Sequence, residues 1–100
     1  MYKIIGILKR PSGMEFEDFK QWWLTEHAPK VQQWPGLKEY RINLCTTPNQ
    51  DFDGVAEVWF DSKEDMDAAF EKSQGKTARE SATSGSSGIH ILFTEETVIV

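Results

Sequence analysis

Residues 14–33 carry apolar side chains at helical spacing. When each residue is placed about 100° from the last, these apolar side chains form the pattern of one long helix, and Pro29 interrupts it. Proline has no N–H for the carbonyl of Thr25 and disfavours helical geometry at the residue before it. The sequence therefore predicts a helix that ends or kinks at Pro29, followed by a short segment that closes at Trp34-Pro35-Gly36. One side of this helix gathers Phe16, Phe19, Trp23, His27, Val31 and Trp34, whereas Trp22 lies off it, as at an edge or an interface.

Four further segments have the composition of β-strands, and a second helix precedes the last of them. Ser62 is the expected N-cap of that helix, and Met66, Ala69 and Phe70 form its apolar stripe. Residues 73–88 are rich in Ser, Thr and Gly and hold no large apolar residue, which predicts a mobile loop with one weak helical turn near 77–82. Strands are predicted at 2–9, 37–46, 55–60 and 89–94, with a loop at 47–54 and a β-rich tail at 97–100.

The order β-α-β-β-α-β is that of the split βαβ, or ferredoxin-like, motif. The fold class is therefore α+β, with a four-stranded antiparallel sheet covered by helices on one face. A chain of 100 residues is the size of one domain, which spans residues 1–100.

The predicted strands carry apolar residues on both faces. Ile4 and Leu8 alternate with Ile5 and Ile7 in the first strand, and Trp59 precedes Phe60 in the third. A face rich in Trp and Ile is not stable in water. We therefore expect a homodimer in which the open sheet faces meet, as in a dimeric α+β barrel, with a cavity between the sheets or one cleft in each subunit.

Charge and motif content limit the function classes. The net charge of −5 and the scattered basic residues argue against nucleic acid or an anionic membrane as partner. The apolar runs are too short to span a bilayer or to form a signal peptide. Two histidines and one cysteine make no metal-ligand set, and no phosphate loop or dinucleotide fingerprint occurs, so no metal or cofactor is expected. The single cysteine, Cys45, suits a reducing cytoplasm.

Four short motifs occur in order along nearly the whole chain. They are Gly13-Met14 before Glu17-x-Phe19, Trp23-x-x-x-His27-Ala28-Pro29, Pro35-Gly36-Leu37-x-x-Tyr40, and Asp53-Gly54-x-Ala56-Glu57-x-Trp59-Phe60-Asp61-Ser62.

With these motifs the sequence resembles the EthD-like family, named for ethyl tert-butyl ether degradation, of the dimeric α+β-barrel superfamily. The resemblance implies the fold and dimerisation. Relatives in the superfamily include polyketide cyclases, a muconolactone isomerase type and cofactor-free or haem-linked monooxygenases, whose active clefts lie between the helices and the open sheet.

The chain departs from the family pattern in three places. Glu15 stands where members usually begin the first helix with Ser or Thr. Relatives often carry a second histidine near Asn43 or Leu44, and none is present here. The Ser/Gly-rich stretch also lacks the aromatic residue often seen there. A two-histidine mechanism is therefore not carried over.

His27 is the candidate catalytic residue. Imidazole accepts and donates a proton near neutral pH. Apolar burial lowers the pKa of His27, and the negative end of a helix dipole raises it. The alternative is a structural histidine whose ring hydrogen bonds cap the backbone beside Pro29.

The candidate substrate-binding residues are aromatic or amide side chains. Tyr40 and Asn43 point to opposite faces of one strand. Asn43 either orients a ligand oxygen or is solvated. Tyr40 either contacts a ligand or belongs to the core. Glu57, a carboxylate in an apolar strand, needs a partner. The aromatic candidates either line a cleft or only pack. The full set is Trp23, Tyr40, Asn43, Trp59 and Phe60.

Three functions are compatible with these features. The first is a small cofactor-independent enzyme of the cyclase, isomerase or monooxygenase type, which acts on an apolar metabolite with His27 as acid/base. The second is a non-catalytic accessory or ligand-binding protein of a degradation pathway. The third, by superfamily analogy alone, is haem-dependent oxygenation with His27 as axial ligand.

Overall fold

The computed structural model describes residues 1–47 and 51–100, and it confirms the ferredoxin-like order of elements. The strands β1 (Tyr2–Lys9), β2 (Glu39–Leu44), β3 (Gly54–Phe60) and β4 (Gly88–Glu95) form one antiparallel sheet in the order β2-β3-β1-β4. Gly6 on the central strand β1 lies opposite Ala56 of β3 and Ile91 of β4. Residues 48–50 of the predicted loop lie outside the described residues.

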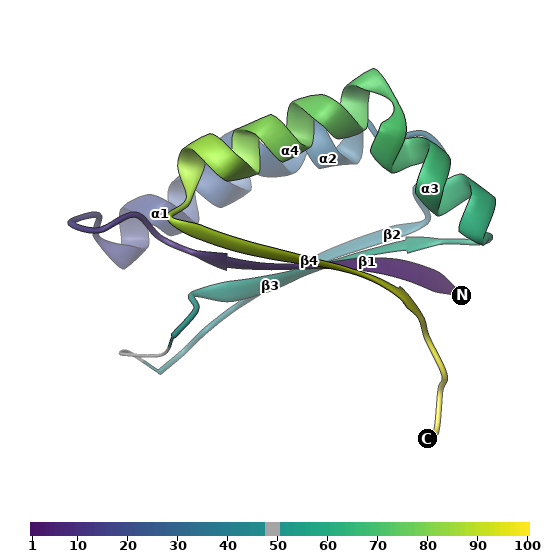
Figure 1. Cartoon of the computed structure of the whole chain (residues 1–100). Helices are drawn as coiled ribbons and strands as arrows, with labels where there is room; N and C mark the ends of the chain where they lie inside the picture. Colours follow the sequence, from purple (N-terminus) through teal and green to yellow (C-terminus); the bar gives the residue numbers. More distant parts are fainter. Residues whose placement is uncertain (48–50) are drawn as a thin grey trace.

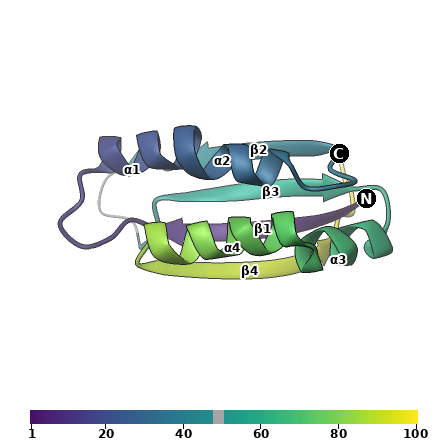
Figure 2. The same ribbon diagram turned by 90° about the horizontal axis from the view of Figure 1, so that it is seen from above.

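The helices cover one face of the sheet, and the other face is open (Figure 1). They are α1 (Phe16–Trp22), a π-helical segment η1 (Trp23–His27), α2 (Ala28–Gln32), α3 (Lys63–Glu71) and α4 (Ser73–Gly85). From above, α1 and α2 form one row beside β2, and α3 and α4 form a second row toward β4 (Figure 2). The buried apolar residues between the helices and the sheet form two clusters, one around Phe60 and Trp34 and one around Trp23 and Phe19.

The predicted interruption of the first helix is a π-helical turn. The backbone stays in the right-handed helical region through His27 and Ala28, and the N–H of Ala28 donates to the carbonyl of Trp23, five residues earlier. Pro29 then lies in the first turn of α2, which follows the π-helical turn directly, and it has no N–H to donate to the preceding turn. The wider turn therefore accommodates the proline without ending the helix. A second expectation is also confirmed, because the Ser62 hydroxyl accepts a hydrogen bond of 3.0 Å from the N–H of Asp65 and caps α3.

The prediction of a mobile loop at 73–88 is wrong, because most of this segment is the helix α4. Ala78, Ser81 and Ala82 of α4 are buried, and α4 packs against α2, α3 and η1. These residues recur at helical spacing, but they are small, so the segment has no apolar stripe of the usual kind. Small side chains let two helices approach closely, and this packing stabilises α4 in place of large apolar residues.

The closest approach in this packing is at Gly85, the last residue of α4. A Cβ atom on Gly85 would overlap the indole ring of Trp22. Beyond β4, residues 97–100 do not form the predicted β-structure, and the chain leaves the sheet on its open side (Figure 1).

We expect Gly85→Ala to lower the free energy of unfolding by about 1–3 kcal/mol, since the new methyl group forces the ring of Trp22 out of place. Gly88→Ala is the control, because its Cβ would lie at an ordinary 3.7 Å from the Cβ of Lys9. Urea denaturation measures both variants. Helix propensity alone would leave the stability of Gly85→Ala equal to or above that of the wild type. That result would contradict the close contact of α4 with Trp22.

Candidate functional site

A small cavity lies between the helices and the covered face of the sheet. Its volume is about 50 Å³, several times the roughly 10–15 Å³ that one buried water needs. Most of its wall is apolar, with Leu8, Val31 and Ile91 among the lining residues. His27 and Tyr40 also line it, and no charged side chain is found among the described lining residues. The cavity therefore suits a neutral, largely apolar group.

The π-helical turn positions His27 at this wall. The imidazole is only 6% exposed, and its Nδ1 lies 3.1 Å from Oγ of Ser81 on α4 in a hydrogen bond. The ring of Trp22 stacks on it, with centroids 5.2 Å apart and planes at 15°. A hydroxyl both donates and accepts, so Ser81 is compatible with either neutral tautomer of the imidazole. His27 is thus oriented from two sides while its proton remains free to sit on either nitrogen.

Burial and charge together keep His27 neutral at physiological pH. Desolvation is the main cause and the nearby positive charge of Lys30 the second, and they lower the pKa of His27 to about 4. Of the two opposing effects expected from the sequence, burial therefore outweighs the helix dipole.

Two polar groups near the cavity have no hydrogen-bond partner among the described residues. They are the hydroxyl of Tyr40 and the indole N–H of Trp23, and both atoms are buried. Burial raises the pKa of Tyr40 to about 12, and the nearby N–H of Trp23 opposes this effect without reaching normal hydrogen-bond geometry. Trp23 itself is fully buried, and its ring fits against β3 because Gly54 there has no side chain.

The structure does not bring all of the predicted site residues together. Phe60 is fully buried in the core, where it stacks on Trp34 at 6.3 Å. Asn43 and Trp59 lie on the opposite face of the sheet from Tyr40 and His27, as their registers with Val55 and Lys3 show. Only His27 and Tyr40 of the predicted residues line the cavity, with Trp23 beside Tyr40.

On the open face, Asn43 and Glu57 belong to a polar network. The amide of Asn43 donates to Glu57 at 3.0 Å and to the carbonyl of Val55 at 3.1 Å. Lys3 forms ion pairs with Glu57 at 2.8 Å and with Glu96 at 3.0 Å. The hydrogen bond from Lys3 is the main cause that lowers the pKa of Glu57. The partner that the sequence required for Glu57 is therefore present.

Trp59 is the apolar centre of the same network. The Nζ of Lys3 and the guanidinium of Arg41 lie 4.8 and 4.9 Å from its ring. Its Nε1 donates to Glu96 at 3.2 Å, and the residue is only 4% exposed. Cations on an aromatic face stabilise such an arrangement. The open face thus combines a tryptophan that charged side chains shield from solvent with apolar neighbours such as Ile5 and Ile7.

Two residues of the site were not predicted, Ser81 and Trp22. In an α-helix, residues 22 and 27 point about 140° apart, but a π-helical turn joins residues five apart and places them on one side. Ser81 was missed because its segment resembles a loop in composition. The signal that identifies it is the set of small residues Ala78, Ser81, Ala82 and Gly85, at spacings of three, four and seven.

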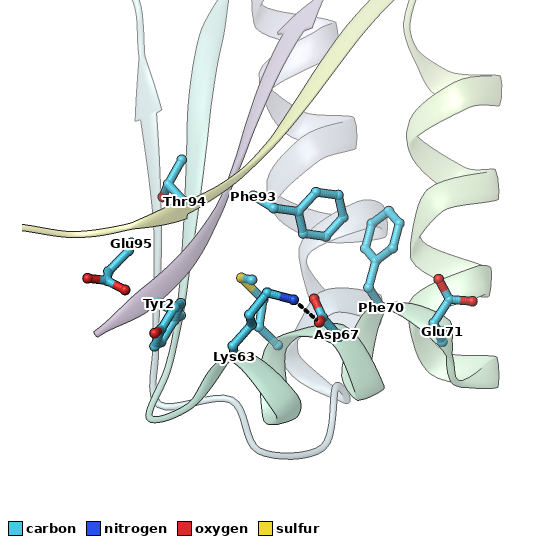
Figure 3. Close-up of a pocket in the computed structure, with 9 residues that line it drawn as sticks. Tyr2, Lys63, Asp67, Phe70, Glu71, Phe93, Thr94 and Glu95 are labelled. Atoms are coloured by element: carbon cyan, nitrogen blue, oxygen red, sulfur yellow. Dashed lines mark hydrogen bonds and ion pairs between the residues drawn. The ribbon is translucent and has the colours of Figure 1, made fainter.

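A larger groove lies elsewhere, between α3 and β4 (Figure 3). Its volume is about 440 Å³, and the rings of Phe70 and Phe93 meet edge to face in its wall at 4.9 Å. On the α3 side of the groove, Lys63 pairs with Asp67 one turn further along the same helix at 2.7 Å. The groove is open to solvent and does not include His27, so we do not place the chemistry there.

Within residues 1–47 and 51–100, no helix is long and apolar enough to cross a bilayer. The same residues contain no cluster of three or more His, Cys, Asp or Glu side chains placed to hold a metal ion.

We expect the stability of the protein to fall as the pH decreases from the usual histidine value of 6.5 toward the folded value of about 4. In this window the unfolded chain binds a proton on residue 27 and the folded protein does not. Between pH 7.5 and pH 5 the loss is about 2 kcal/mol, and well above pH 6.5 the effect is absent. Urea denaturation at both pH values measures it.

His27→Asn removes this part of the pH dependence and keeps an amide that can bond Ser81, whereas His90→Asn on the exposed edge strand retains it. An equal pH dependence in the wild type and His27→Asn would show that His27 is not buried in its neutral form.

The comparisons with known proteins agree with this fold. Residues 11–82 match the EthD domain. The chain is 27% identical over 108 residues to an uncharacterised 11.0 kDa protein in the thcB–thcC intergenic region of Rhodococcus erythropolis, covering 100% of this chain and 99% of the relative.

Two crystal structures have similar folds. An ethyl tert-butyl ether degradation (EthD) family protein from Bacillus halodurans is 21% identical, with a TM-score of 0.86, and the match covers 97% of this chain and 99% of the other. A dimeric protein of unknown function with a ferredoxin-like fold from Bacteroides fragilis is 11% identical, with a TM-score of 0.72, and the match covers 95% of each chain. With most of its length matched to the domain, this chain belongs to the EthD family.

Proposed function

We propose that this protein is a small enzyme that uses His27 as acid/base on an apolar, neutral metabolite bound in the cavity between the helices and the sheet. One observation carries the proposal. A neutral imidazole, oriented by Ser81 and Trp22, lies at the wall of an apolar cavity. Buried titratable groups with strongly shifted pKa values in cavities are typical of active sites.

The chemistry that this arrangement supports is proton transfer at a carbon next to a carbonyl. With the proton of His27 on Nδ1, donated to Ser81, Nε2 has a free lone pair and takes a proton from the carbon. The electron pair of the C–H bond moves into the enolate, whose oxygen takes the negative charge. The imidazolium then returns the proton to carbon or oxygen. Isomerisation and cyclisation need such a step, and it requires no cofactor.

The low pKa of His27 leaves it unprotonated at neutral pH and makes it a weak base. A base whose conjugate acid has a pKa of about 4 is weak, and its protonated form is a strong acid. His27 is therefore unprotonated and available at neutral pH, and it gives back quickly any proton that it takes. This behaviour suits a reaction that removes and returns one proton.

We expect the protein in D2O to exchange the α-protons of small carbonyl compounds such as cyclopentanone and γ-butyrolactone, with loss of their proton NMR signals. His27→Asn should reduce the protein-dependent rate by at least about 100-fold, the usual contribution of general acid–base catalysis. His90→Asn is the control and keeps the wild-type rate.

Exchange that survives His27→Asn, or no exchange above the buffer rate in the wild type, would contradict the enzymatic proposal. Saturable binding without exchange would favour the alternative, an accessory or ligand-binding protein.

We also propose that two copies of the chain associate through their open sheet faces. Ile5, Ile7 and Leu92 lie on this face beside the network around Trp59, and Leu92 is 46% exposed. Burying such a surface against a second copy removes it from water. The Bacteroides fragilis relative of the same fold is described as dimeric, which supports the proposal.

Ile7→Glu places a charge at the centre of this face, opposite Val55 and His90. We expect the wild type to elute with the mass of a dimer in size-exclusion chromatography with light scattering, and Ile7→Glu with that of a monomer. Leu24→Glu is the control, an exposed leucine in the helical layer that should leave the dimer intact. A wild-type monomer at micromolar concentration would contradict the arrangement.

A further inference from the structure

The unpartnered hydroxyl of Tyr40 and N–H of Trp23 cost free energy in the protein without a ligand. A buried donor that makes no hydrogen bond has lost its contact with water without replacement. Nearly all buried polar groups in folded proteins have a partner, so an exception calls for an explanation. Here two exceptions lie side by side, and one of them lines the cavity that His27 also lines.

Both groups carry a hydrogen to donate, although the phenol oxygen can also accept. An indole N–H only donates, and a phenol whose pKa is raised to about 12 keeps its proton at neutral pH and donates as well. A group that satisfies them must therefore accept hydrogen bonds. This requirement excludes a pure hydrocarbon as the preferred occupant.

The rest of the wall decides between a charged and a neutral acceptor. A carboxylate or phosphate would need a buried cation, and the described lining residues include no lysine or arginine. His27 cannot take that role, because it is neutral at physiological pH. A neutral, mostly apolar molecule with one acceptor atom can bond the two donors and needs no buried cation.

We propose that the Tyr40 hydroxyl and the Trp23 indole N–H form a binding subsite for the carbonyl oxygen of a neutral ligand such as a ketone or a lactone. The inference rests on the proposed function in taking this cavity as the ligand site. It adds the class of ligand and the two groups that recognise it. With its oxygen on Tyr40, the ligand holds the carbon next to the carbonyl in the same cavity as His27, and the hydrogen bond strengthens as the oxygen gains enolate charge.

The test compares two ligands of nearly equal shape. Cyclopentanone carries the acceptor oxygen, and methylenecyclopentane replaces it with a CH2 group. We expect the wild-type protein to bind cyclopentanone about tenfold more tightly than methylenecyclopentane, measured by NMR titration. Tyr40→Phe removes the hydroxyl alone and should abolish this difference. Tyr2→Phe is the control, since Tyr2 lines the separate groove between α3 and β4 (Figure 3).

A second readout in the wild-type protein does not depend on any variant's stability. The four tryptophans give four indole N–H signals, and that of Trp23 should move downfield with cyclopentanone and not with methylenecyclopentane. Its assignment comes from the signal that is missing in Trp23→Phe, or from through-space contacts to Gly54 if that variant does not fold.

Equal affinity for the two ligands, no saturable binding of cyclopentanone, or a preference that persists in Tyr40→Phe would overturn the inference. These outcomes separate it from the enzymatic proposal. If cyclopentanone binding depends on Tyr40 but no His27-dependent exchange occurs, the subsite stands and catalysis fails. If exchange depends on His27 but Tyr40→Phe binds cyclopentanone as the wild type does, catalysis stands and the subsite fails.

Discussion

Helix α4 reaches the π-helical turn because the side chains between them are small. Ala78, Ser81 and Ala82 are buried in this contact, and Gly85 leaves room for the ring of Trp22. A larger residue at any of these positions would move α4 outward and separate the hydroxyl of Ser81 from His27. The hydrogen bond of His27 to Ser81 follows from this close approach, which adds to the burial that, together with Lys30, lowers the pKa of His27. The packing of two helices therefore controls the protonation of the candidate catalytic residue.

The sheet divides the molecule into two regions with different roles. On the covered face, alternate residues of the strands form an apolar wall that includes Tyr40, and His27 faces it from the helical layer; these two are the titratable groups among the described residues that line the cavity. On the open face, Lys3 pairs with both Glu57 and Glu96 beside Trp59, and the guanidinium of Arg41 on the same ring adds a second positive charge. A paired network of this kind is compatible with burial against a second copy, since unpaired charges would oppose association. The proposed ligand site and the proposed dimer interface therefore use opposite faces of the same strands and do not compete for residues.

The order of elements along the chain and the antiparallel sheet with helices on one face could be predicted because period-two and helical patterns of large apolar residues carry that information directly. The capping role of Ser62 and the need of Glu57 for a partner also followed from local chemistry. Helix α4 could not be predicted in this way, because close packing of Ala and Ser leaves no hydrophobic stripe. The stacking of Trp22 on His27 was hidden for a different reason: α-helical geometry separates these residues, and only the π-helical turn beside Pro29 aligns them. The division of Asn43 and Tyr40 between the two faces was predicted, but which face holds His27 required the fold.

Helix α4 seals a neutral His27 into the wall of the cavity. The most direct test of this arrangement is a long-range 1H–15N NMR titration of the two imidazoles, with the His90 signals assigned from His90→Asn. The account predicts that His27 remains neutral well below the usual pKa of 6.5, with a midpoint of about 4, and that its nitrogen shifts change when cyclopentanone is added. A midpoint near 6.5, with shifts that do not respond to cyclopentanone, would contradict it.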